Sequence, residues 1–79
     1  MATVDIENTL KEVKELVSHF IKMPETKMWI DYDREADVLY ISFRRPQKAT
    51  DSEMLENGIL LRYKGEELVG ITVLNASKR

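Results

Sequence analysis

Residues 38–44 read VLYISFR, and this stretch decides the fold because apolar side chains occupy both of its alternating sets of positions. Successive side chains of a strand point to opposite faces of a sheet. Leu39, Ile41 and Phe43 therefore point one way, and Val38 and Tyr40 point the other. An antiparallel sheet with one solvated face alternates between apolar and polar residues instead. This strand indicates a sheet that needs an apolar cover on both faces.

Residues 67–75, ELVGITVLN, repeat the same pattern. Val69, Ile71 and Val73 oppose Leu68 and Leu74, so this strand is also apolar on both sides. A glycine within a strand marks a bulge or a close approach of another segment, and we expect that role for Gly70. Both stretches predict strands of a sheet that is apolar on its two faces.

Two further strands are expected at residues 28–32 and 58–63, where β-branched and aromatic residues are frequent. Residues 33–37 and 64–66 fit the turns that join them to the strands above. The longer connection at residues 46–57 leaves open a short extra strand at 52–56, turned by Asn57-Gly58, a pair typical of type I′ hairpins. The expected sheet is mainly antiparallel and four-stranded.

Residues 4–22 predict one helix, because apolar residues recur there at steps of 4, 3, 4 and 3 along a single face. Thr3 is the expected cap, and Pro24 marks the end. We therefore expect an α+β fold of one domain, residues 1–79, with the helix packed on the sheet core of residues 28–79. The same spacing also fits a coiled-coil seam, so the helix has two possible partners, its own sheet or a second subunit.

A single helix covers only one face of a sheet, and a chain of 79 residues has little other material. A second copy of the chain is the simplest cover for the remaining face. We therefore expect a homodimer or higher homo-oligomer that acts as a protein–protein interaction module. The expected interface residues on the helix are Leu10, Val13, Val17 and Phe20.

Composition excludes several classes of protein. The chain has no cysteine, which excludes disulfides and thiolate zinc sites. It has no apolar run long enough to cross a membrane, and its net charge of −2 gives no global attraction for nucleic acid. We expect a cytoplasmic protein without cofactors.

The acidic stretch DYDREAD, residues 31–37, raises the question of a metal or catalytic site. A calcium loop counted from Asp31 needs glycine at its sixth position and glutamate at its twelfth, where this chain has Ala36 and Ser42. Asp33 is better explained as an acceptor for turn amides. A weak divalent site or a small hydrolase stays as an alternative, and we expect no enzymatic activity. That alternative rests on Asp31, Asp33, Glu35 and Asp37.

Basic residues follow the second strand and close the chain. If Arg44, Arg45, Lys78 and Arg79 converge with Lys48, a local basic patch exists on an acidic protein. Such a patch offers an alternative function, the binding of phosphate or nucleic acid.

The motifs YDREADVLYI, residues 32–41, and VGITVLNASK, residues 69–78, resemble the small family known as domain of unknown function family 2283. The resemblance covers about residues 28–79 and implies no established activity, although it adds the option of an antitoxin-like partner of another small protein. Within it, Asn75 and Ser77 are expected to hold the chain terminus against the turn near Asp33. The motif residues with an expected structural role are Tyr32, Asp33, Glu35, Ala36, Asp37, Gly70, Asn75 and Ser77.

Overall fold

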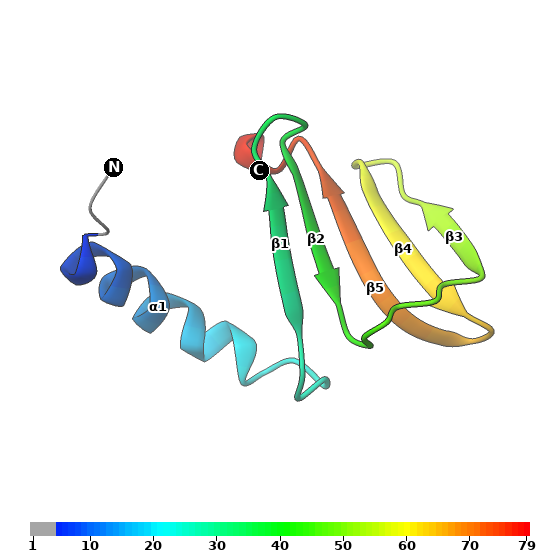
Figure 1. The fold of residues 1–79 in the computed structure, drawn as a ribbon, viewed down its shortest axis with the longest axis horizontal. Helices are drawn as coiled ribbons and strands as arrows, with labels where there is room; N and C mark the ends of the chain where they lie inside the picture. Colours follow the sequence, from blue (N-terminus) through cyan, green and yellow to red (C-terminus); the bar gives the residue numbers. More distant parts are fainter. Residues whose placement is uncertain (1–4) are drawn as a thin grey trace.

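A computed structural model describes residues 5–79, which form one α-helix and one five-stranded antiparallel sheet (Figure 1). The α+β class is confirmed. The expected count of four strands is wrong, because the connection at residues 46–57 contains a short edge strand. The elements are α1 (Ile6–Phe20), β1 (Trp29–Asp33), β2 (Val38–Ser42), β3 (Asp51–Met54), β4 (Ile59–Lys64), β5 (Glu67–Leu74) and a turn of 3-10 helix, η1 (Ala76–Lys78).

The strands lie in the order β1-β2-β5-β4-β3. The two stretches that are apolar on both sides, β2 and β5, are neighbours at the centre of the sheet (Figure 1). Their register places Val38 opposite Leu74 and Ser42 opposite Gly70. Each of the two central strands carries its own hairpin, with β1 beside β2 and β4 beside β5.

Two hairpin turns show how local residues set the strand register. Gly65 has a positive φ of 64°, and Lys64 pairs with Glu67 across a two-residue turn, as expected. The turn from β3 to β4 differs from the expected type I′, which requires positive φ at both central residues. Gly58 alone adopts positive φ, at 81°, and its N–H donates to the carbonyl of Leu55 at 3.2 Å. This three-residue turn keeps Asn57 in an ordinary conformation, which costs less than a left-handed one.

The helix begins at Ile6, one residue after the described part of the chain starts. Asp5 is its N-cap and accepts a hydrogen bond from the Asn8 N–H at 3.0 Å, whereas the expected cap, Thr3, lies outside the described residues. The helix ends at Phe20, and Ile21 is the C-cap.

The expected packing of the helix on its own sheet is wrong. The helix lies beside the β1 edge and extends away from it (Figure 1), and none of its residues is buried. The physical reason lies in the linker, residues 21–28, which joins the helix to an edge strand. In this linker Glu25 forms an ion pair with Arg44 at 3.3 Å, and Arg44 also pairs with Glu67 at 2.9 Å, so the linker is held at the end of the sheet.

The core of the single chain is small. Among the described residues only Val38, Phe43 and Val69 are buried hydrophobic residues. A β-bulge pairs Tyr63 with Leu68 and leaves Val69 as the extra residue, so Leu68 faces the side of Tyr63 and not that of Leu74 as expected. Within residues 5–79, no helix combines the length and the apolar character needed to cross a membrane.

Candidate functional site

The helix exposes a continuous apolar surface, here called the helical stripe. Its members recur at helical spacing, so they lie along one side of α1 and its C-cap. Their side chains are exposed or half-buried, with Ile6 at 69% exposure and Leu16 at 43%. The stripe consists of Ile6, Leu10, Val13, Leu16, Val17, Phe20 and Ile21.

One face of the sheet is a second apolar surface, here called the apolar sheet face. Directly opposed residues of antiparallel strands share a face, so the register defines two rows that cross four strands. None of the eight side chains is buried, and Ile30 is 47% exposed. The first row is Tyr32, Leu39, Val73 and Ile59, and the second is Ile30, Ile41, Ile71 and Leu61.

The opposite face is mixed, so the two faces are less alike than the sequence suggested. One of its rows places Asp31 beside Tyr40 and Thr72. The loop that follows β2 also covers part of this face, because Gln47 Nε2 donates to Ser42 Oγ at 2.8 Å. The same Gln47 amide occupies the space over Gly70 that a Cβ would fill. Gly70 thus permits the close approach of another segment that was expected there, and that segment is the loop after β2.

Asp37 joins the first hairpin to the end of the chain. Its Oδ1 accepts hydrogen bonds from the Tyr32 hydroxyl at 2.6 Å and from the Ser77 N–H at 3.0 Å. Its Oδ2 accepts from the Ser77 hydroxyl at 2.8 Å, and its backbone carbonyl accepts from the Ala76 N–H at 2.9 Å. Asp37 adopts a left-handed conformation with φ 57°, which aims its side chain at the terminus. The expectation that Ser77 holds the terminus against this turn is confirmed, but the sequence did not identify Asp37 as the acceptor.

These hydrogen bonds also affect the pKa values of Asp37 and Tyr32. The hydrogen bond from Tyr32, followed by those from Ser77, lowers the pKa of Asp37 below its ordinary value of 3.8. The same hydrogen bond to Asp37 raises the pKa of Tyr32 above 10.0. Asp37 is thus an ionised acceptor and Tyr32 a neutral donor at neutral pH, and their hydrogen bond holds β1 to the turn that follows it.

The other motif residues build the two turns that Asp37 connects. Asp33 Oδ1 accepts from the Glu35 N–H at 3.1 Å and from the Ala36 N–H at 3.2 Å, the role expected for it. Asn75 has a positive φ of 52° and makes no capping hydrogen bond with its side chain. In the described part of the chain, no group of three or more acidic, histidine or cysteine residues is placed to hold a metal ion.

The four expected basic residues do not form one patch, and that prediction is wrong. Arg44 and Arg45 follow the end of β2, whereas Lys78 and Arg79 lie beyond the end of β5, where Leu74 pairs with the start of β2. The length of β2, about 13 Å for four steps of 3.3 Å, separates the two pairs. The strands run antiparallel, which is a property of the sheet and not of the local sequence.

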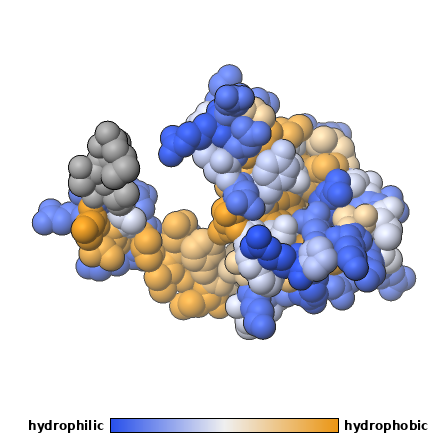
Figure 2. All heavy atoms as spheres, viewed as in Figure 1, coloured by the Kyte–Doolittle hydropathy of each residue, from blue (hydrophilic) through white to orange (hydrophobic). Residues whose placement is uncertain are grey.

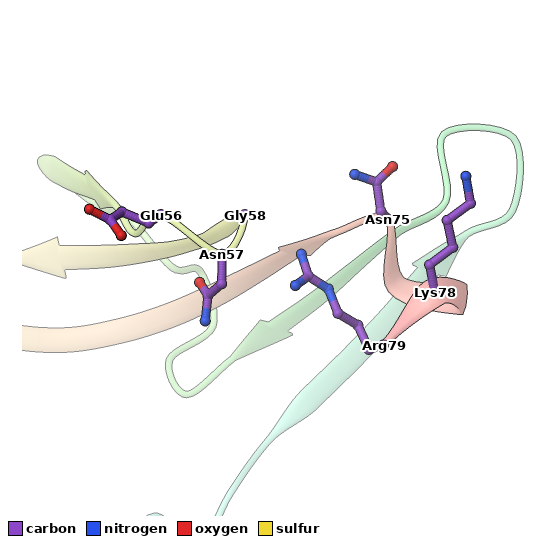
Figure 3. A pocket seen from close by; sticks show the side chains of 6 residues that line it. All are labelled: Glu56, Asn57, Gly58, Asn75, Lys78 and Arg79. Atoms are coloured by element: carbon purple, nitrogen blue, oxygen red, sulfur yellow. The ribbon is translucent and has the colours of Figure 1, made fainter.

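The C-terminal pair lines a shallow cleft of about 460 Å³ (Figure 3). Arg79 reaches toward Asn57 and Gly58, whereas Lys78 points away from them. The Arg79 guanidinium is already engaged, because its Nε and Nη2 donate to the Leu74 carbonyl at 3.2 and 2.7 Å. This contact fixes the end of the chain.

A different set of basic residues does converge. A cleft of about 470 Å³, here called the basic cleft, is lined by Arg44, Arg45, Lys48 and Lys64, with Glu67 as its acidic residue. Lys64 was not expected there, because it belongs to a hairpin distant in sequence. The Thr50 N–H donates to the Tyr63 carbonyl at 2.8 Å and brings the two segments together.

A family model described as "Protein of unknown function (DUF2283)" matches residues 29–77 of the chain, which include all five strands. No curated protein and no solved structure matches the chain.

Proposed function

We propose that this chain, which belongs to the DUF2283 family of proteins of unknown function, is an interaction module that assembles with a second copy of itself. The observation that carries this proposal is the pair of uncovered apolar surfaces, the helical stripe and the apolar sheet face. Soluble monomers rarely expose apolar patches of more than a few hundred Å². Burial of such surface from water is the main favourable term in protein association.

The small core supports the same proposal. With Val38, Phe43 and Val69 as the buried hydrophobic residues of the described chain, most of the apolar side chains in the strands are only half-buried. Small domains commonly complete their core through oligomerisation. A two-fold dimer is the commonest closed arrangement, and it uses the same surfaces on both subunits.

Sedimentation velocity over a range of micromolar concentrations tests the proposal. We expect a particle of about 18 kDa, twice the 9.2 kDa of one chain. Val13→Asp places a charge in the middle of the helical stripe and should shift the particle to one chain while the circular dichroism of the sheet persists. The matched control is Asn8→Asp, which adds the same charge to α1 on the side away from both the stripe and its lysine flank. A folded wild-type chain that sediments as a monomer would refute the proposal.

The basic cleft favours a second candidate, the binding of an anionic ligand such as a phosphate group. Four basic residues line the cleft, and one of them, Arg44, pairs with Glu67. Within the described residues, no acidic side chain forms an ion pair with the other three, Arg45, Lys48 and Lys64. We expect a short RNA to bind at low salt and to lose affinity as salt rises, because each phosphate contact releases counterions. The double variant Lys48→Ala/Lys64→Ala should abolish this binding, and fluorescence anisotropy measures it. Equal binding by Lys78→Ala and wild type is the control.

A further inference from the structure

We infer that the two copies exchange helices, so that the apolar sheet face of each copy is covered by α1 of the other. This inference rests on the proposed self-association and names the contact that produces it. Each chain has an apolar helix, none of whose residues is buried, and an apolar sheet face that is also left exposed or half-buried. Exchange of an identical element between protomers is a low-cost route to a dimer.

The dimensions of the two surfaces match. The helix has 15 residues and is therefore about 22 Å long at 1.5 Å per residue. The rows of the apolar sheet face cross four strands, which span about 14 Å between the outer strand axes at a spacing of about 4.8 Å. A helix with its side chains is about 10–12 Å across, so one helix covers most of both rows.

The placement of the helix explains why the exchange occurs between chains and not within one. Figure 1 shows α1 directed away from the β1 edge, and Figure 2 shows a hollow between the helix and the sheet, with hydrophobic residues over the helix and beside the hollow. Phe20 and Ile21, at the end of the helix, line a cleft together with Met23 and Met28 of the linker. The Arg44–Glu25 ion pair fastens that linker to the sheet.

Charges around the two surfaces are complementary. Lys14 lies four residues after Leu10 and three before Val17, so it borders the helical stripe. Lys11 continues that flank, which also carries Glu7 and therefore has a net charge of +1. On the sheet, the edge strand β3 pairs Asp51 with Tyr63 and Glu53 with Leu61, which places both acidic side chains beside the apolar sheet face. A helix laid on that face with its lysine flank toward β3 therefore meets opposite charges.

Exchange also uses more apolar surface than the alternative of two stripes packed on each other. Seven apolar residues of the helix and eight of the sheet face become covered on each chain. A standard protein interface has about 20–30 residues on each side, which these residues and their polar border supply. Pairing of the two stripes alone leaves the sheet face exposed to water.

Chemical cross-linking of full-length chains through introduced cysteines tests the exchange. Because the chain has no cysteine of its own, each introduced cysteine is the one site at which the reagent can link that chain. One chain carries Val13→Cys in the helical stripe, and a second, isotope-labelled chain carries Ile71→Cys in the apolar sheet face. The two chains are mixed, unfolded and refolded together, and treated with a short bismaleimide. We expect a linked product that contains one chain of each kind. Glu15→Cys, on the side of α1 opposite the stripe, replaces Val13→Cys in the control and should give no such product.

The other outcomes separate this inference from the proposed self-association. A dimer linked only through two Val13→Cys chains means that the stripes pair with each other, which overturns the exchange and keeps the self-association. A single chain that carries both Val13→Cys and Ile71→Cys provides a further comparison. If cross-links form only within this chain and never between two chains, the helix folds back on its own sheet, and the exchange is again overturned. Monomeric wild-type chain overturns both. Ile30→Cys, at an exposed position of the same face, replaces Ile71→Cys if that variant fails to fold.

Discussion

Substitution of Gly70 by alanine tests how the loop after β2 is held on the sheet. The added methyl group would overlap the Gln47 amide and lie 3.1 Å from the Ile41 carbonyl. The Gln47 side chain has to leave, and its hydrogen bond to Ser42 Oγ at 2.8 Å is lost with it. Because Gln47 belongs to the loop that carries the basic residues, the substitution also loosens the basic cleft.

The size of the effect follows from three terms. The lost hydrogen bond costs about 1 kcal/mol, and crowding in a packed site costs about 1–3 kcal/mol. Replacement of glycine by alanine in a strand raises the free energy of unfolding by about 0.5–1 kcal/mol, because the unfolded chain has less conformational freedom to lose. We expect Gly70→Ala to lower the free energy of unfolding by about 1–2 kcal/mol, at the lower end of the crowding range because the displaced group is the flexible end of a side chain.

A double-mutant cycle with Gln47→Ala isolates the contact. Gln47→Ala alone should cost about 1 kcal/mol through the same hydrogen bond. In that background Gly70→Ala should be neutral or slightly stabilising, since the overlapping amide is gone. Urea unfolding followed by the fluorescence of Trp29 measures all four proteins at one protein concentration, because association shifts the apparent stability. An equal loss of stability on Gly70→Ala with and without Gln47 would show that the crowding lies elsewhere and refute this reasoning.

Two further predictions concern the hairpin connection and the core. Because the hydrogen bonds of the folded state lower the pKa of Asp37 below 3.8, its contribution to stability is present above that value and is lost as the pH falls below it toward the folded-state pKa. Asn also suits the left-handed backbone at this position, so Asp37→Asn should fold. In this variant the urea concentration at the unfolding midpoint should fall less steeply as the pH is lowered through the acid range. An equally steep fall in the variant and the wild type would contradict the role given to Asp37. Phe43 is 3% exposed, and Phe43→Ala should cost about 3–5 kcal/mol and abolish the cooperative thermal transition. Tyr40→Ala, which removes a 43% exposed ring from β2, the strand that precedes Phe43, is the control and should retain the transition.

The sequence by itself determined the local elements, because each depends on neighbours along the chain. The period of the helical stripe, the alternation in residues 38–44 and the turn at Gly65 all predict what the structure contains. The side-chain acceptor Asp33 was also predictable, since the amides that it serves lie two and three residues ahead.

Only the tertiary structure decided how distant segments meet. It places α1 away from its own sheet and separates Arg44 from Lys78, while it joins Asp37 to Ser77 across 40 residues. Strand order and register set these relations, and a single bulged residue moves a side chain such as Leu68 to the other face. Local propensity carries no information on such long-range pairing, because the free energy that selects it comes from packing and hydrogen bonds formed after the chain has folded back on itself.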